Sequence, residues 1–291
     1  MDQASGATAA SENDIYANPL DVTTLELEPG HPGLGDAGYI ARREELFALC
    51  REHRLKNLGP PRIDYTDEEQ RIWREVSPQL AALHVSHASR IYLQAKRDLG
   101  ISATEIPQLR DLSERVQARS GMHLVPAEGP IPYRTFYSYI AERGFPVTQF
   151  IRHGSKPEFT PEPDMIHDCL GHVPPLVNHD YAALLTLIGK AAVSVKTGDH
   201  VLALKRLSWF SIEFGLIDEN SKPKIYGSGL ISSSGDAANA LGPTCNRRPF
   251  TLDGVITQSF RIDKLQDTLF VVDAFDQLYE AVDEIMARMA D

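Results

Sequence analysis

Residues 160–175 read TPEPDMIHDCLGHVPP, a stretch that combines two histidines with helix-capping and helix-ending residues. Asp164 follows a proline and has a side chain that accepts hydrogen bonds from free backbone N–H groups, so it is expected to cap a short helix over residues 165–170. Gly171 and the two prolines that follow are typical helix-ending residues. The stretch therefore predicts a short helix that ends at Gly171.

Two histidines flank this predicted helix end. His167 lies on the helix and His172 just beyond it, and their spacing of five residues does not align two side chains on an α-helix, where residues four apart share a face. A chain that leaves the helix at Gly171 can return His172 to the side of His167. The pair is then suited to bind a metal ion, although histidines at this spacing also occur by chance.

A carboxylate in an apolar context is the third candidate ligand. Residues 209–216 read WFSIEFGL, and on a helix Glu213 shares its face with Trp209, Phe210 and Leu216. An ionised carboxylate among apolar groups needs a partner, which is either an arginine or lysine elsewhere in the chain or a metal ion. Two imidazoles and one carboxylate, without cysteine, match the facial donor set that leaves coordination positions open on Fe(II).

The composition is that of a globular protein. The 291 residues are 42% hydrophobic and 24% charged, which is ordinary for a folded domain. Residues 1–30 are rich in small and acidic residues without sustained periodicity, and this predicts a disordered or extended leader. The rest of the chain shows no internal repeat and no change in composition, so we expect one domain over residues 31–291.

Charge and cysteine content narrow the setting and the partners. A net charge of −11 without a lysine or arginine cluster argues against nucleic acid as a partner. Cys50, Cys169 and Cys245 are odd in number and irregularly spaced, which indicates neither a disulfide framework nor a cysteine zinc site and favours the cytoplasm. No signal peptide or membrane-spanning apolar run is present, so no membrane association is expected.

Helical periodicity dominates the predicted elements. Apolar residues from Phe275 to Met289 recur on one face, Asn178 can cap a helix that runs through Ile188, and a further helix is expected from about Asp199 to Leu216. Strand-like segments are short. They are Lys224 to Tyr226, Val255 to Arg261 and Leu269 to Val272. The expected fold is mainly α, a helical basket with a small β-sheet.

The chain resembles the pterin-dependent aromatic amino acid hydroxylases, the family of phenylalanine, tyrosine and tryptophan hydroxylases. The likeness runs from about His31 to Val282. Its blocks, in order, are HPGLGDAGYIARREE, PRIDYTDEEQRIW, EIPQL, FIRHGSKPEFTPEPDMIHDCLGHVP, WFSIEFGL, YGSGLISS and LQDTLFVVDAF. The resemblance implies that residues 31–291 are the catalytic iron- and pterin-binding domain, with three iron ligands. These are His167, His172 and Glu213.

The resemblance also implies a substrate site. Its residues would be Arg152, Thr160, Pro163, Trp209 and Ser232. Arg152 would bind the substrate carboxylate with Thr160 and Ser232, and Asp164 would orient Arg152 through a charge-assisted hydrogen bond. Trp209 and Pro163 would pack around the substrate ring. Without the matched blocks, Arg152 is better explained as a surface cation and Trp209 as a core residue.

A pterin site is implied by residues 129–136, which read GPIPYRTF. Phe136 matches the phenylalanine on which the pterin stacks, and Gly129 and Ile131 match backbone contacts to its edge. Asp168 stands where family members have glutamate or aspartate, and it should reach the pterin through water. The alternative for this looser block is a helix start with Phe136 in the core.

The implied activity is a monooxygenase that uses Fe(II), tetrahydrobiopterin or a related tetrahydropterin, and O₂. It would hydroxylate the ring of a free aromatic amino acid, with phenylalanine, converted to tyrosine, as the expected substrate. Three departures concern specificity: Ser208 stands where most members have an aromatic residue, Cys169 where a larger aliphatic is usual, and Asp236 where a glutamate is usual. Each reduces volume near the iron or pterin, so meta hydroxylation or tryptophan as substrate is the alternative.

Two other classes of protein are compatible with the same candidate metal ligands. A zinc hydrolase also binds metal with His, His and Glu, but its usual helical motif is H-E-x-x-H, which this chain lacks. A hydroxylase relative that binds metal or pterin without catalysis is the other rival. The leader is too irregular for a regulatory domain and no heptad tail follows the last helix, so the sequence predicts a monomer.

Overall fold

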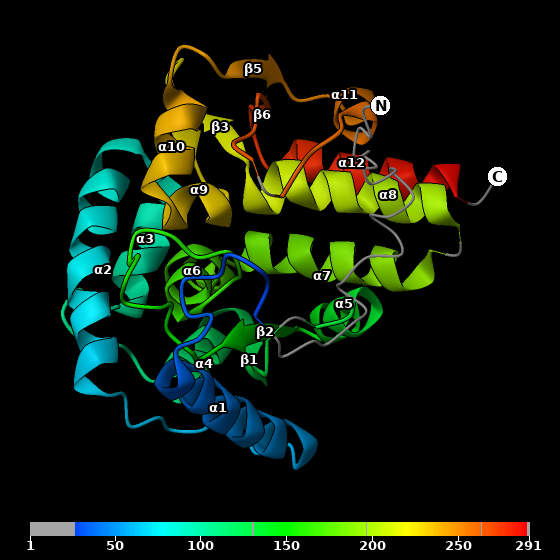
Figure 1. The fold of residues 1–291 in the computed structure, drawn as a ribbon. Helices are drawn as coiled ribbons and strands as arrows, with labels where there is room; N and C mark the ends of the chain where they lie inside the picture. Colours follow the sequence, from blue (N-terminus) through cyan, green and yellow to red (C-terminus); the bar gives the residue numbers. More distant parts are fainter. Residues whose placement is uncertain (1–26, 130, 196, 263, 290–291) are drawn as a thin grey trace, which may run out of the picture.

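The computed structural model describes residues 27–129, 131–195, 197–262 and 264–289 (Figure 1). Most of the predicted leader, residues 1–26, lies outside this part of the chain. The α-helices are α1 (Ala37–Leu55), α2 (Asp67–His87), α3 (Arg90–Leu99), α4 (Leu109–Ser120), α5 (Tyr133–Ala141), α6 (Met165–His167), α7 (His179–Ser194), α8 (Gly198–Ser208), α9 (Ser228–Ser232), α10 (Ser234–Leu241), α11 (Leu252–Thr257) and α12 (Asp276–Arg288). The fold is mainly helical with small sheets, which confirms the prediction.

Three further helical segments and six strands complete the described part. Two segments are π-helices, η3 (Asp168–His172) and η5 (Trp209–Glu213), and a 3₁₀ helix, η4 (Pro174–Val177), follows η3 directly. The strands are β1 (His123–Ala127), β2 (Gly144–Thr148), β3 (Leu216–Asp218), β4 (Pro223–Ile225), β5 (Asn246–Pro249) and β6 (Thr268–Val272).

The strands form two small sheets. β1 and β2 pair in parallel, with Val125 opposite Pro146, and α5 makes the crossover between them. The second sheet has the order β4-β3-β6-β5, in which β3 and β4 form an antiparallel hairpin while β6 runs parallel to both β3 and β5. The first sheet lies near α1 and α4, and the second lies across the molecule near α8 and α11 (Figure 1).

The helices enclose the segment that contains both candidate histidines. α7 packs against α5, α8 and α12 (Figure 1). α3 packs against η4. Residues 165–176 are buried except for His167, which is half-buried. The large hydrophobic core therefore surrounds this segment and leaves His167 partly exposed.

Local capping explains where several helices begin. Asn178 accepts a hydrogen bond from the Tyr181 N–H and caps α7, as predicted. The predicted C-terminal helix is confirmed as α12, whose buried residues are Leu278, Ala281, Val282 and Ile285. Their spacing of three and four residues is that of an amphipathic helix that packs one face on the core.

Two predicted elements need correction. Residues 255–261 are not a strand, because Thr251 caps α11 by accepting from the Gly254 N–H, and the helix then buries Leu252 and Val255 three positions apart. The helix predicted to reach Leu216 ends as α8 at Ser208, continues as η5, and gives way to β3, which contains Leu216. Within the described residues, no helix is both long and apolar enough to span a membrane.

Candidate metal centre

A π-helical turn brings the two histidines together. Asp164 caps α6 by accepting from the His167 N–H across 3.0 Å, and the chain then continues into η3 without a break. In η3 the Val173 N–H donates to the Asp168 carbonyl, five residues earlier, across 3.0 Å. Residues five apart therefore lie on one face, and the Nε2 atoms of His167 and His172 are 3.2 Å apart.

The predicted helix end at Gly171 is wrong, and packing explains the glycine instead. Gly171 lies inside η3 rather than at a helix end. A Cβ at this position would lie 2.9 Å from both the Cβ and the carbonyl oxygen of Ser228 in α9. The glycine thus allows α9 to approach the backbone of the histidine segment closely.

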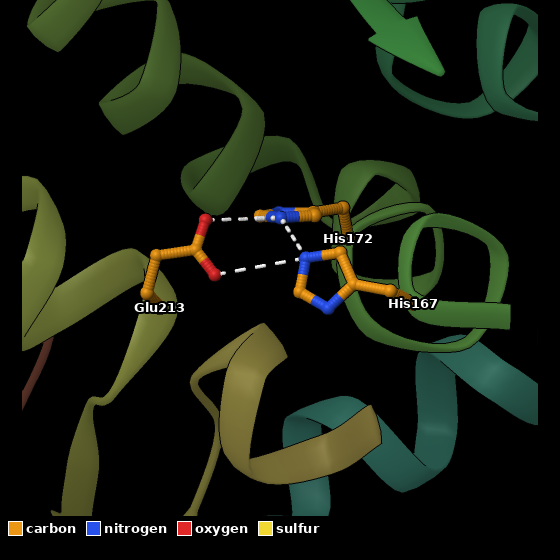
Figure 2. A group of neighbouring side chains, drawn as sticks. All are labelled: His167, His172 and Glu213. Atoms are coloured by element: carbon orange, nitrogen blue, oxygen red, sulfur yellow. Dashed lines mark hydrogen bonds and ion pairs between the residues drawn. The ribbon is translucent and has the colours of Figure 1, made fainter. Parts of the chain in front are cut away.

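A second π-helix carries the carboxylate. In η5 the Phe214 N–H donates to the Trp209 carbonyl across 2.9 Å, again over five residues. Glu213 Oε1 lies 3.1 Å from His172 Nε2, and Oε2 lies 3.8 Å from His167 Nε2 (Figure 2). The three side chains each offer one donor atom within 4.8 Å of the others.

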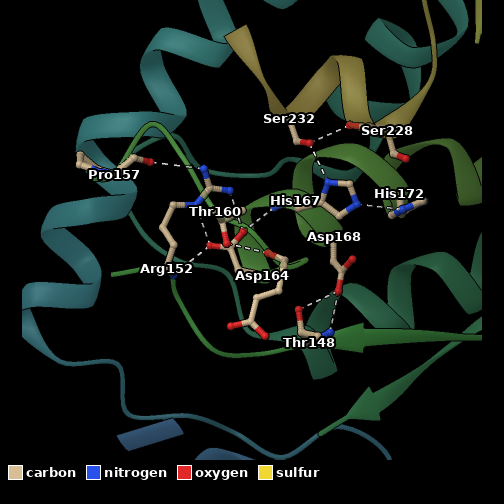
Figure 3. A network of polar contacts seen from close by, with 11 residues as sticks. Thr148, Arg152, Pro157, Thr160, Asp164, His167, Asp168, His172, Ser228 and Ser232 are labelled. Carbon is tan, nitrogen blue, oxygen red and sulfur yellow. Dashed lines mark hydrogen bonds and ion pairs between the residues drawn. The ribbon is translucent and has the colours of Figure 1, made fainter. Parts of the chain in front are cut away.

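Serine hydroxyls orient two of these three side chains. Ser232 Oγ donates to the Ser228 carbonyl across 2.8 Å, so it accepts from His167 Nδ1, which is also 2.8 Å away (Figure 3). His167 is thereby held with its proton on Nδ1 and a lone pair on Nε2, toward the other two candidate ligands. Ser228 Oγ lies 2.7 Å from Glu213 Oε2 and can donate to it.

The electrostatics are those of a half-buried group whose members stabilise one another. Burial alone would raise the pKa of the Glu213 carboxyl, but His172, His167 and the Ser228 hydroxyl outweigh it and lower that pKa to about 2. Burial and then the neighbouring His172 lower the pKa of His167. Burial would also lower the pKa of His172, but Glu213 outweighs this effect and raises that pKa instead. A cation would take the place of that proton between His172 and the ionised Glu213, beside the unprotonated Nε2 of His167, so the donor set fits a metal ion.

An ion pair lies beside the metal candidates. Arg152 donates to Asp164 from its backbone N–H and Nε, each 2.9 Å from Oδ2, and from Nη2 to Oδ1 across 2.7 Å. Its Nη1 donates to the Pro157 carbonyl across 3.3 Å (Figure 3). Both side chains are at most 3% exposed. Burial raises the pKa of Asp164, but Arg152 outweighs this effect and leaves the pKa below its usual value.

Thr160 and Pro163 lie in the loop that precedes α6. Thr160 Oγ donates to the Glu162 carbonyl across 2.6 Å and is half-buried, whereas Pro163 is exposed. The Glu162 carboxylate is in turn bound by Arg43 of α1 and lies 3.2 Å from His31 Nε2. The loop with both predicted substrate residues is thus attached to α1.

Trp209 is held from two sides. Its ring stacks on Phe260 with centroids 4.5 Å apart and planes 19° apart, and it also contacts Phe214. Its Nε1 donates to Gln266 Oε1 across 3.2 Å. Gln266 is buried and uses its amide group to donate to the carbonyls of residues 261 and 264, each across 2.7 Å.

Of the predicted pterin residues, Phe136 is connected to His172 through Phe145. Phe136 contacts Phe145 edge-to-face at 5.8 Å between centroids, and Phe145 contacts the His172 ring at 5.0 Å. Gly129 has a φ of 108°, a conformation that favours glycine, and Ile131 is half-buried. Pro130, between them, lies outside the described residues.

Asp168 and Cys169 follow His167 directly in the chain, and the Asp236 carboxyl interacts electrostatically with His167. Asp168 Oδ2 accepts from the Thr148 N–H and Oγ, across 2.7 and 2.8 Å. Burial, opposed by both histidines, raises the pKa of Asp168. Cys169 is fully buried. Asp236 is half-buried in α10, and burial raises the pKa of its carboxyl.

Ser208, the third specificity candidate, reveals a residue that the sequence reasoning missed. Ser208 Oγ accepts a hydrogen bond from Tyr137 Oη across 2.9 Å. Tyr137 is buried in α5 next to Phe136. Ser228 was missed as well, although it belongs to the matched YGSGLISS block, and Gln266 was missed although it begins the QDTLFVVDAF segment.

Fold and site together define a mainly helical protein with a two-histidine, one-carboxylate candidate metal centre, a donor set typical of non-haem iron oxygenases. Residues 8–290 match the family model described as biopterin-dependent aromatic amino acid hydroxylase. The chain belongs to this family.

Individual proteins agree with this placement. The chain is 34% identical over 275 residues to phenylalanine-4-hydroxylase of Mus musculus, covering 93% of this chain and 60% of that protein. It is 34% identical over 297 residues to tyrosine 3-monooxygenase of Canis lupus familiaris, covering 96% of this chain and 59% of that protein. This chain therefore spans less than two thirds of either relative.

A solved structure is similar as well. Phenylalanine hydroxylase of Chromobacterium violaceum, with bound iron(III) and oxidised cofactor 7,8-dihydrobiopterin, superposes with a TM-score of 0.73 at 33% identity. The match covers 78% of this chain and 84% of that one.

Proposed function

We propose that this chain is an Fe(II)- and tetrahydropterin-dependent monooxygenase that hydroxylates the ring of a free aromatic amino acid. The proposed substrate is L-phenylalanine. The observation that carries the proposal is the convergence of His167, His172 and Glu213, whose donor atoms lie within 4.8 Å of one another. These residues would hold the iron, facing open positions for O₂. Family membership and the iron- and pterin-bound relative support the same assignment.

When bound, ferrous iron and a reduced pterin would together supply the electrons that reduce O₂, so that one oxygen atom enters the ring. The chain's own residues would position the reactants. The apolar walls around Trp209, Phe145 and Phe260 would limit access of water to the reacting ring. Residues 31–291 would form this catalytic domain.

Arg152 would bind the substrate carboxylate. A guanidinium has five N–H groups, and the described contacts use three of them, two for Asp164 and one for Pro157. The remaining two are one on Nη1 and one on Nη2, and this pair of terminal nitrogens would bind a carboxylate bidentately. Asp164 fixes the plane of the guanidinium because it binds Nε and the other N–H of Nη2.

Other residues would complete the substrate site. The resemblance implies that Ser232 helps to bind the substrate carboxylate, but its hydroxyl proton is donated to the Ser228 carbonyl. Its oxygen has one lone pair left beyond the contact with His167, so it would instead accept from the substrate ammonium group. Thr160 would add a contact to the carboxylate, and Trp209 and Pro163 would border the ring. The indole is the better defined of these two walls because Phe260 and Gln266 hold it.

The pterin would lie on the other side of the metal site. Phe136 would stack on the bicycle, and the backbone at Gly129 and Ile131 would read its edge. Asp168 has one carboxylate oxygen engaged by Thr148, and the other would contact the pterin through water.

Hydroxylation of the meta carbon, or tryptophan as substrate, is the second candidate within the same chemistry. The observation that favours it is the reduced volume at Ser208 and Cys169, together with Asp236. The Tyr137 hydroxyl occupies part of the space beside Ser208.

We also propose that the protein is a monomer in the cytoplasm. Three free, buried cysteines support a reducing setting.

Anaerobic reconstitution tests the function. The chain is loaded with Fe(II) and tetrahydrobiopterin and then given O₂ and phenylalanine, tyrosine or tryptophan in turn. We expect a hydroxylated amino acid, with a loss of at least about tenfold in iron affinity for Glu213→Gln, because a neutral amide is a weaker ligand than a carboxylate.

The same assay separates the rival classes. Purification with bound zinc and no pterin-dependent product would favour a zinc hydrolase, and iron binding without hydroxylated product would indicate a non-catalytic relative. Arg152→Lys serves as the substrate-site variant, because lysine keeps the charge but loses the bidentate geometry. Its KM for the amino acid should rise by about tenfold or more, while iron affinity stays unchanged.

A further inference from the structure

Leu170 has a backbone carbonyl that its own helix cannot satisfy. It lies in η3, between the two candidate ligand histidines, and the residues four and five positions later are Pro174 and Pro175, which have no N–H. The Val173 N–H, three positions later, donates to Asp168 instead. A buried carbonyl without a donor destabilises the fold, so this turn requires a donor from another element.

Tyr92 of α3 provides that donor. Its hydroxyl donates to the Leu170 carbonyl across 2.7 Å, and the tyrosine is only 1% exposed. Since Leu170 lies between His167 and His172, the bond fixes the backbone that carries both imidazoles. The length and burial of this bond give the hydroxyl one defined position.

His84 of α2 makes a corresponding contact to α9. Its Nε2 lies 2.8 Å from the Ile231 carbonyl, and because a carbonyl only accepts, Nε2 carries the proton. Nδ1 is then the acceptor, and Lys96 Nζ lies 2.9 Å from it. Burial and the Lys96 charge lower the pKa of His84 to about 4, so the ring stays neutral near neutral pH.

The two contacts belong to one buried unit. The His84 and Tyr92 rings meet with centroids 5.0 Å apart and planes at 73°. One partner binds the histidine segment, and the other binds Ile231, directly before Ser232, whose hydroxyl accepts from His167. The pair therefore connects η3 and α9, the two segments that set the position and the tautomer of His167.

We propose that Tyr92 and His84 are positioning residues of the metal centre, holding η3 and α9 at the separation that metal binding requires. The proposal rests on the proposed function, because it assumes that His167 and His172 bind a metal ion. Neither side chain contacts the candidate ligands themselves. Their effect is transmitted through the Leu170 and Ile231 carbonyls.

Cobalt(II) binding tests the proposal independently of turnover. The full metal-free chain is titrated with Co(II), and the visible ligand-field absorption reports both affinity and coordination geometry. The variants are Tyr92→Phe, which removes only the hydroxyl, His84→Leu, which removes the donor, and His84→Gln, whose amide N–H can reach the same carbonyl. Tyr279→Phe is the matched control, because its hydroxyl also donates to a backbone carbonyl, that of Asp180, across 2.5 Å.

A positioning role predicts weaker and altered cobalt binding. Tyr92→Phe and His84→Leu should each weaken Co(II) binding by about tenfold and shift the absorption bands, as removal of outer partners of metal ligands does. His84→Gln should restore most of the affinity, and Tyr279→Phe should bind like the unmodified chain. Thermal unfolding of every variant separates these effects from loss of fold.

Two results would overturn the proposal, and they differ. If Tyr92→Phe and His84→Leu lose thermal stability but bind cobalt with unchanged affinity and bands, the contacts only stabilise the fold, and the proposed function stands. If the unmodified chain itself fails to bind Co(II) or Fe(II), the proposed function fails and the positioning role fails with it.

Discussion

The Tyr137 hydroxyl donates to Ser208 Oγ across 2.9 Å, and this bond joins α5 to the residue that directly precedes η5. α5 carries Phe136, the candidate pterin platform, and η5 carries Trp209 and Glu213. The bond therefore links the pterin side of the proposed site to its metal and substrate side. A change here should alter how the substrate ring is placed rather than whether metal binds.

We expect Tyr137→Phe to change the ratio of hydroxylated products. A single neutral hydrogen bond contributes about 0.5–1.5 kcal/mol, so the ratio of meta to para product from phenylalanine should shift by about two- to tenfold. Chromatography of the products, with oxidised pterin measured in parallel, provides the readout. Tyr133→Phe is the control on the same helix, because the Tyr133 hydroxyl has no partner within the described residues. An unchanged ratio in Tyr137→Phe would remove this pair from the determinants of regiochemistry.

Asp164 should make stability depend on acidic pH. Its pKa in the fold lies below the usual 3.8, so the ionised carboxylate stabilises the fold above pH 3.8, and this contribution is lost as the pH falls through the lower folded value. Asp164→Asn leaves the buried Arg152 without its counter-charge and should cost about 3–5 kcal/mol at pH 7.

Urea unfolding at several pH values measures this effect. The difference in unfolding free energy between the unmodified chain and Asp164→Asn should be constant near neutrality and shrink below pH 3.8. Glu52→Gln, which removes an exposed carboxylate paired with Lys56, is the control and should leave stability nearly unchanged. A difference that grows with acidity would contradict the assigned direction of the Asp164 pKa.

The sequence predicted the elements whose signals are local. The side chains of Asn178 and Asp164 cap helices wherever a free N–H follows, and the apolar period of residues 275–289 indicates a buried face by itself. The same reasoning failed at residues 255–261, because β-branched residues indicate strands unless a cap such as Thr251 starts a helix ahead of them.

The π-helical turns could not be predicted from local sequence. A hydrogen bond from residue i+5 rather than i+4 is selected by what packs around the turn, such as the approach of Ser228 to Gly171. The two histidines were correctly expected to lie together, but the expected cause, a helix end at Gly171, was wrong. Contacts such as Tyr92 to Leu170 and Tyr137 to Ser208 join residues more than 70 positions apart, so no periodicity indicates them.

Gly171→Ala should distinguish a packing glycine from a helix-ending glycine. The added Cβ would lie 2.9 Å from Ser228, so α9 must move, at a cost of about 1–3 kcal/mol. Because Ser228 and Ser232 of α9 contact Glu213 and His167, iron affinity should fall as well. Gly198→Ala is the control: it lies in α8 with nothing within 4 Å of an added Cβ, and it should be neutral or slightly stabilising. An iron affinity of Gly171→Ala equal to that of Gly198→Ala would refute the packing role.

Gln266 should control the orientation of the Trp209 indole. Gln266→Leu removes the acceptor of the indole N–H and both amide donors that hold the loop carrying Phe260, and unpaired buried groups of this kind cost about 1–3 kcal/mol each.

Fluorescence measures the effect on the indole. The chain has 2 tryptophans, so the emission of Trp209 is obtained by subtracting the spectrum of Trp209→Phe. We expect this emission to shift to the red, and the KM for the amino acid to rise by several-fold, about what 1 kcal/mol corresponds to. Iron affinity should not change, since Gln266 contacts none of the candidate ligands in the described structure. A red shift without any change in KM would mean that the indole moves but does not border the substrate, which would remove Trp209 from the proposed substrate site.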